Sequence, residues 1–321
     1  MNKPDKQEKS LEDRIYLPVM NPNKAIIEIG DFIVNQIVSA GYKGGVIGLS
    51  GGVDSTVAAH IAKKGFDRYN AKHPDKPLHL TGYILPSSTN NEKNTKDAVA
   101  VAEGLGIDYH IQSIEPIIKA YEITNPKVMK NPFCKGNMMA EIRANFLHGE
   151  AGEQKKLVIG TGNKDEDFNL AYYTLFGDGA VHMSPLGNLS KRLVRQIAKH
   201  QGYYEIAGKV STAGLEPGQT DFKDLGYNYD LAELVMEGKT QGFTWEQLAQ
   251  HKQVAKVAKR DRENYATIYG ASKFRTTKQM VENIKCRHYV AGKKAEIVHP
   301  PIAPVTLIYL TFLPREEKTW S

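Results

Sequence analysis

Cysteine is scarce in this chain: Cys134 and Cys286 are the only two among 321 residues. They lie far apart in the sequence, neither belongs to a CxxC pair, and neither has a close histidine partner. This spacing argues against a zinc site and against a disulfide framework. We therefore expect both thiols to be reduced and the protein to be cytoplasmic.

Long apolar runs are also missing, and the mean hydropathy is −0.44. No stretch is long enough to span a bilayer, so we expect no membrane partner. Residues 1–14 are mostly polar and charged, without the apolar centre of a secretory signal. We expect residues 1–12 to form a flexible N-terminus.

The charge balance is moderately basic, with 42 Lys and Arg against 36 Asp and Glu, a net charge of +6. The positive charge is spread along the chain, and no RNA-binding motif is present, so we expect no nucleic-acid partner. The same charge suits polyanionic small molecules. A Walker A loop is absent as well, because Val210 follows Gly208-Lys209 where Ser or Thr is required.

The most informative segment that is present is Ser50-Gly51-Gly52-Val53-Asp54-Ser55. It follows the apolar run 45–49, which is typical of a buried parallel strand, and it precedes a helical pattern that begins near Ser55. Glycines let the backbone approach an anion, and the free amides of a helix N-terminus favour negative charge. The segment therefore predicts a phosphate-binding loop.

Strand and helix patterns alternate through the first two thirds of the chain. This alternation predicts an α/β fold, a doubly wound parallel sheet flanked by helices, with ligands at the carboxyl ends of the strands. The predicted strands cover 45–49, 78–85, 108–114 and 156–161. The predicted helices cover 23–40, 55–62, 96–105, 137–147 and 189–200.

The pattern changes beyond residue 203. A polar, glycine-containing segment at 208–226 predicts a long functional loop, and 229–237 and 245–269 predict helices. The tail contains a β-prone apolar run at 304–313. We expect a synthetase-like domain over 13–275, with a helical C-terminal part, and an extension of unknown role over 276–321.

The SGGVDS segment resembles the pyrophosphate loop of the N-type ATP pyrophosphatases, whose fold is adenine nucleotide α-hydrolase-like. Residues from 23 to about 275 further resemble ammonia-dependent NAD synthetase. That resemblance depends on several blocks in the right order. They are Leu85-Pro86, Lys135-Gly136-Asn137 with Ala140 and Arg143, Gly160 to Glu166, Tyr173 to Gly179, Leu189-Ser190-Lys191, and Ser211 to Leu215.

The resemblance implies a ligase that forms a carbon–nitrogen bond. The nicotinate carboxylate of deamido-NAD attacks the α-phosphorus of ATP, pyrophosphate leaves, and ammonia then attacks the acyl-adenylate to give NAD and AMP. Adenylation is needed because oxide is a poor leaving group. The implied ligands are ATP, Mg²⁺, deamido-NAD and ammonia, and the implied working form is a homodimer. Tyr172 and Met138-Met139 have a composition suited to its interface.

The resemblance also assigns roles to individual positions. The catalytic residues it implies are Asp54, Asp178 and Lys191. The ATP-binding residues are Gly48, Ser50, Gly51, Gly52, Asp54, Ser55, Thr161, Lys191 and Thr212. The deamido-NAD-binding residues are Asn137, Arg143, Lys164 and Asp178. The metal carboxylates are Asp54 and Glu166, since Mg²⁺ prefers hard oxygen ligands.

The chain departs from the family pattern at several points. Ile84 stands where many members have arginine, and Glu141 replaces one of two basic residues. One additional residue between Thr161 and Gly177 leaves open whether Glu166 or Asp167 is the second metal carboxylate. Two alternative functions also stay open: another adenylating N-type ATP pyrophosphatase, or a non-catalytic nucleotide-binding protein of the same fold.

Overall fold

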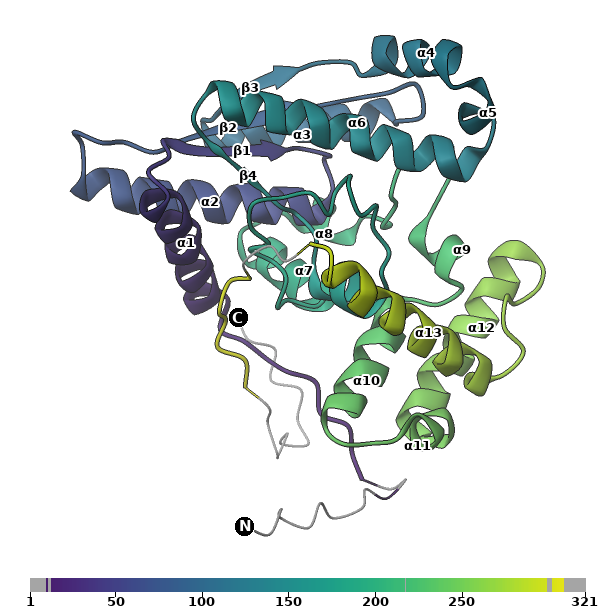
Figure 1. Ribbon diagram of the computed structural model, residues 1–321. Helices are drawn as coiled ribbons and strands as arrows, with labels where there is room; N and C mark the ends of the chain where they lie inside the picture. The colour runs from purple at the N-terminus through teal and green to yellow at the C-terminus, as the bar shows by residue number, and fades with distance from the viewer. Residues whose placement is uncertain (1–9, 11–12, 217, 299–301, 309–321) are drawn as a thin grey trace.

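The computed structural model describes residues 10, 13–216, 218–298 and 302–308 (Figure 1). Most of the predicted flexible N-terminus and the last part of the 304–313 run lie outside the described residues. Within the described ranges, no helix has both the length and the apolarity that a membrane span requires.

A parallel sheet of four strands lies at the centre of the α/β part, in the order β3-β2-β1-β4. In its register, Val46 pairs with Thr81 on one side and with Val158 on the other. The order confirms the predicted doubly wound arrangement, because the chain proceeds outward from β1 to β3 and then returns to the other side of β1 at β4. The strands are β1 (Gly44–Gly48), β2 (His79–Ile84), β3 (Asp108–Ile111) and β4 (Leu157–Ile159).

Both faces of the sheet are covered by helices, and successive side chains point to opposite faces. Ile47 and Ile159 pack in one core with α1, α2 and α7, whereas Val46 and Val158 pack in another with α4 and α6. Burial on both faces explains why β1 and β4 are continuous apolar runs, whereas the edge strand β3 is mostly exposed. The helices are α1 (Pro22–Ser39), α2 (Val53–Lys72), α3 (Glu92–Leu105), α4 (Glu115–Thr124), α5 (Pro126–Met129), α6 (Pro132–Glu153) and α7 (Lys191–His200).

The C-terminal helices pack around a core of their own, separate from the two cores at the sheet, which we call the second core. Figure 1 shows these helices grouped together away from β2 and β3. The predicted helix 245–269 is in fact two helices. His251 has extended backbone angles (φ −64°, ψ 132°) and its side chain caps the second helix by accepting from the Gln253 amide. The helices of this part are α9 (Asp221–Leu225), α10 (Tyr229–Thr240), α11 (Trp245–Gln250), α12 (Lys252–Tyr269) and α13 (Thr277–Ala295). Helix α8 (Tyr204–Gly208) instead packs on α7, in the same core as α1 and α2.

Helix α13 is the longest of the helices that the sequence did not predict. The others are α4, α5, α8 and α9, and the last of these lies within 208–226, which was expected to be a loop. Thr276 and Gln279 form a capping box at the start of α13, and Met280, Val281 and Ile284 are buried in the second core. The capping pattern and the helical spacing of these apolar residues were the available signals. The boundary at residue 275 stays a prediction, but the first half of the extension shares a core with α10 to α12.

Candidate active site

The segment 50–55 forms a tight turn between β1 and α2. Gly51 has φ +72°, and a Cβ there would lie 2.1 Å from the carbonyl oxygen of Asn94, so glycine is required on both counts. The Ser50 amide donates to Ser55 Oγ at 3.2 Å, and the two hydroxyl oxygens lie 3.0 Å apart. The predicted turn at a helix N-terminus is therefore formed, and its binding of phosphate stays a prediction.

A buried lysine joins two carboxylates beside this turn. Lys191, in the first turn of α7, places its Nζ 2.6 Å from Asp54 Oδ2 and 2.7 Å from Glu166 Oε1. Asn163 Nδ2 donates to the other oxygen of Asp54 at 2.9 Å. Three segments far apart in the sequence thus bring together a lysine and the two carboxylates that the resemblance assigned to metal.

The electrostatics of this cluster follow from its burial. Burial raises the pKa of Glu166 to about 8, with Asp54 and Asp221 adding to the rise and Lys191 opposing it. Burial alone would lower the pKa of Lys191, but Asp54 and Glu166 outweigh that effect and raise it. The ammonium therefore stays charged, and it is the counter-charge that keeps the neighbouring carboxylates together.

Glu166 and Asp167 occupy different places. They lie in a π-helical turn, η1 (Lys164–Asn169), whose wider i→i+5 turn holds one more residue than an α-helical turn. Glu166 contacts Lys191, whereas the carboxylate of Asp167 lies against Gly162. Burial raises the pKa of Asp167, and Glu166 and Asp178 raise it further. The geometry thus pairs Glu166, rather than Asp167, with Asp54.

The oxygen ligands near Lys191 suit a hard cation. Tyr229 donates its hydroxyl to Asp221 Oδ2 at 2.7 Å and to Glu166 Oε1 at 3.3 Å, which leaves Asp221 Oδ1 buried without a hydrogen bond. Within the described ranges, no group of three or more His, Cys, Asp or Glu is arranged to hold an ion by itself. One or two carboxylates are enough for Mg²⁺, which usually keeps water and bridges substrate phosphates.

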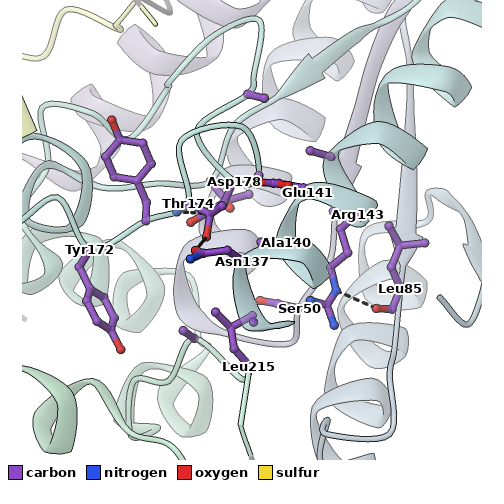
Figure 2. Close-up of a pocket in the computed structure, with 18 of the residues that line it drawn as sticks. Ser50, Leu85, Asn137, Ala140, Glu141, Arg143, Tyr172, Thr174, Asp178 and Leu215 are labelled. Atoms are coloured by element: carbon purple, nitrogen blue, oxygen red, sulfur yellow. Dashed lines mark hydrogen bonds between the residues drawn. The ribbon is translucent and has the colours of Figure 1, made fainter. Parts of the chain in front are cut away.

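A cavity of about 1040 Å³ opens next to the turn. In Figure 2, Ser50, Arg143 and Leu85 lie on one side of the cavity, and Tyr172 lies on the other side. Its walls come from the carboxyl ends of β1, β2 and β4, from α6, from the 171–181 loop and from α13. The predicted site residues that line it are Gly48, Ser50, Asn137, Arg143, Thr161 and Asp178.

Asp178 and Asn137 are held in place through Thr174. The Thr174 amide donates to Asp178 Oδ1 at 2.8 Å, and its hydroxyl donates to Asn137 Oδ1 at 2.6 Å. Burial raises the pKa of Asp178. Figure 2 shows the three side chains together in the cavity. A buried carboxylate with a raised pKa is a better proton acceptor than an exposed one.

Arg143 braces the carboxyl end of β2. Its Nε donates to the Leu85 carbonyl at 3.0 Å, and its Nη2 donates to Ser87 Oγ and Asn90 Oδ1 at 3.2 and 3.0 Å. Burial lowers its pKa to about 10, with Asp178 opposing the change. Ile84 and Glu141, the two positions that depart from the family pattern, line the same cavity.

The other predicted site residues do not line the cavity. Gly51, Gly52, Asp54, Ser55, Glu166 and Lys191 belong to the turn and the lysine cluster beside it, but Lys164 and Thr212 lie apart from both. Lys164, expected to bind deamido-NAD, places its Nζ 2.6 Å from Oε1 of the buried Glu237. Thr212, expected to contact phosphate, is exposed, and its hydroxyl accepts from the Gly214 amide at 3.0 Å. The geometry does not bring either side chain to the other site residues.

The sequence reading also missed residues at the site. Lys209, set aside as part of a failed Walker A match, donates from Nζ to the Gly51 carbonyl at 2.7 Å and so touches the phosphate-binding turn. Arg287, Val290 and Lys294 of α13 line the cavity. Their spacing of three and four residues, which places them on one helix face, was the signal that could have found them.

The comparisons with known proteins agree with this geometry. The family model described as NAD synthase matches residues 25–278. An NH(3)-dependent NAD(+) synthetase of Methanococcoides burtonii is 34% identical over 64% of this chain and 76% of its own, and one of Thermococcus kodakarensis is 37% identical over 66% and 79%.

Among solved structures, an NMN synthetase from Francisella tularensis has a TM-score of 0.68 and 27% identity, covering 88% of this chain and 99% of its own. An NH3-dependent NAD synthetase from Campylobacter jejuni shares the fold, with a TM-score of 0.61 at 21% identity over 86% and 97%. This chain belongs to the NAD synthase family and is a carbon–nitrogen bond-forming ligase that uses ATP.

Proposed function

We propose that this chain amidates deamido-NAD with ammonia at the expense of ATP, releasing NAD, AMP and pyrophosphate. The observation that carries the proposal is the single cavity that reaches from Ser50 of the phosphate-binding turn to Asp178. A nicotinate carboxylate and the α-phosphate of ATP can meet in that space, which is the arrangement that adenylation requires.

In the first step, a carboxylate oxygen of the nicotinate attacks the α-phosphorus, and the bond from that phosphorus to the bridging oxygen breaks. Negative charge develops on the departing pyrophosphate. The free amides of the turn would stabilise that charge, while the buried ammonium of Lys191 balances Asp54 and Glu166 beside the turn. Lys209 at the Gly51 carbonyl holds the turn in its shape.

Magnesium belongs to the same proposal. Asp54 and Glu166 are the residues that would hold it, and the partnerless Asp221 Oδ1 marks a nearby surplus of negative charge. When bound, the ion would neutralise charge on the ATP phosphates.

In the second step, ammonia attacks the acyl carbon, and AMP leaves with the electrons of the acyl–oxygen bond. Ammonium must first lose a proton. We assign Asp178 as the acceptor, because it lines the cavity and its pKa is raised by burial. The Thr174 amide holds its Oδ1, leaving the other carboxylate oxygen for this role.

A second candidate substrate is nicotinate mononucleotide. The specific observation in its favour is the likeness to the Francisella tularensis protein, an NMN synthetase, which covers 99% of that chain at 27% identity. Both candidates present the same nicotinate carboxylate and need the same two steps. They differ only in the adenylate half, which is distant from the reacting atoms.

A homodimer and a cytoplasmic location complete the proposal. Two of the residues expected at the interface are not free to form it, because Met139 is buried in the core and Tyr172 packs against the second core. The exposed aromatic side chains that line the cavity are Phe133 and Phe176, at 75% and 58% exposed. A partner subunit that covers them would close the cavity. The cytoplasmic location rests on the scarcity of cysteine, with two in 321 residues.

The test is a turnover assay with purified enzyme, ATP and Mg²⁺, in which the amide product, AMP and pyrophosphate are measured. Deamido-NAD and nicotinate mononucleotide are compared, each with ammonium or with glutamine free of ammonia. We expect ammonium-dependent amide formation that is lost in Asp54→Asn. Release of pyrophosphate without amide, or equal turnover with glutamine, would contradict the proposal.

A further inference from the structure

Helix α13 reaches the cavity with two basic side chains, although it lies almost wholly beyond the residues that match the family model, which end at 278. Arg287 and Lys294, with Val290 between them, form what we name the α13 wall. Its residues stand at positions i, i+3 and i+7, so they share one helix face. Lys273, just before the helix, adds a third positive charge to the same lining.

The α13 wall is fixed against the π-helical turn. His288 Nδ1 lies 3.1 Å from the Phe168 carbonyl oxygen, and Arg287 Nη1 lies 3.5 Å from that of Leu170. Lys294 donates to the Ala171 carbonyl at 3.0 Å and to the Tyr173 carbonyl, with its Nζ 4.2 Å from the centre of the Tyr173 ring. Lys294 therefore holds the backbone that leads to Asp178.

Arg287 has hydrogen-bonding capacity left over. Its Nε donates to Asn283 Oδ1 at 3.2 Å, so only two of its five N–H groups have acceptors among the described residues. Within the same residues, neither Arg287 nor Lys294 nor Lys273 forms an ion pair. Burial lowers the pKa of Lys294 and of Lys273. Asp178 and Asp167 oppose this at Lys294 and Asp224 opposes it at Lys273, while the charge of Arg287 lowers both. Three positive side chains that share one cavity lining without forming ion pairs among the described residues favour an anion there.

We propose that the α13 wall is an anion subsite in which Arg287 binds the phosphate of the nicotinate nucleotide while Lys294 positions the 171–173 backbone. The inference rests on the proposed function. A planar guanidinium with free N–H groups matches phosphate oxygens better than any other side chain. The phosphate of a mononucleotide and the diphosphate bridge of a dinucleotide share this chemistry.

The experiment tests a variant of Arg287 on ligands that carry the phosphate and on one that lacks it. Arg287→Gln is compared with wild type on nicotinate mononucleotide, on deamido-NAD and on nicotinate riboside, which lacks the phosphate. Binding is measured by calorimetry, and KM and kcat are measured where turnover occurs. Lys285→Gln is the matched control, because Lys285 lies on the same helix, pairs with Glu282 and does not line the cavity.

We expect Arg287→Gln to weaken binding of the phosphate-bearing ligands about 10- to 100-fold, to leave the riboside within about twofold, and to leave KM for ATP unchanged. Arg287→Lys should recover part of the loss. The ligand with the larger loss identifies whether a monophosphate or a diphosphate occupies the subsite.

An equal loss on the riboside, or no loss on any ligand, would overturn the subsite. If wild type produced no amide but bound the mononucleotide through Arg287, the subsite would stand and the proposed function would fall. The two failures are therefore distinguishable.

Discussion

Replacing Lys191 by methionine tests whether its ammonium is the counter-charge of the site. The change keeps the length of the side chain but removes the charge 2.6 Å from Asp54 and 2.7 Å from Glu166. Lys191 is only 4% exposed, so water cannot take its place easily. Two carboxylates would then face each other in a buried site.

The size of the effect follows from that burial. Removing one partner of a buried ion pair costs about 3–5 kcal/mol, because the remaining charge is left uncompensated. The matched control is Lys63→Met, which removes an i,i+4 partner of the half-exposed Asp67. Exposed pairs of this kind contribute about 0.2–1 kcal/mol. We therefore expect a several-fold larger loss at Lys191.

The loss should also depend on pH. Glu166 has a pKa near 8 in the fold, against an ordinary value of 4.5, so the folded state holds this proton more tightly than the unfolded chain. Its contribution to stability thus falls as pH rises from about 4.5 through 8. Without Lys191 this pKa rises further, so the deficit of the variant should stay level below about pH 8, where Glu166 keeps its proton in both folded proteins. Above pH 8 it should grow, by at most about 1.4 kcal/mol per pH unit for one proton.

The assay is urea unfolding followed by circular dichroism at pH 6, 7.5 and 9, with EDTA present so that no metal ion replaces the ammonium. Adding Mg²⁺ should then stabilise the variant more than the wild type. A deficit under about 1 kcal/mol at pH 9, or one that does not change with pH, would refute the counter-charge role.

The remaining predictions concern the turn and the hydrogen bond between Tyr229 and Asp221. Gly51→Ala should raise KM for ATP at least about tenfold, because the added Cβ would lie 2.1 Å from the Asn94 carbonyl oxygen. The control is Gly104→Ala, whose added Cβ meets nothing within 4 Å and which should leave KM for ATP unchanged. Tyr229→Phe should lower the free energy of unfolding by about 1–3 kcal/mol, because Asp221 loses its hydroxyl donor in a buried site; chemical denaturation checks this, and a loss below about 0.5 kcal/mol would contradict it.

The local elements of the α/β part could be predicted from the sequence alone. Gly51 and Ser55 at the end of an apolar run specify a phosphate-binding turn, because few residue types allow that backbone and that anion contact. Glycine at 106 ends α3 in the left-handed conformation, as its position predicted. These features depend only on residues a few positions apart in the chain, so the local sequence pattern is enough to predict them.

The tertiary structure decided which of these residues meet. Lys191 lies 137 residues from Asp54, and only the packing of α7 beside α2 brings its ammonium to the carboxylate. The placement of Glu166 rather than Asp167 at that ammonium depends on a π-helical turn, which residue spacing does not reveal. Arg287 entered the cavity only because α13 packs on that turn. Contacts between distant segments depend on how whole helices pack, and no local pattern contains that information.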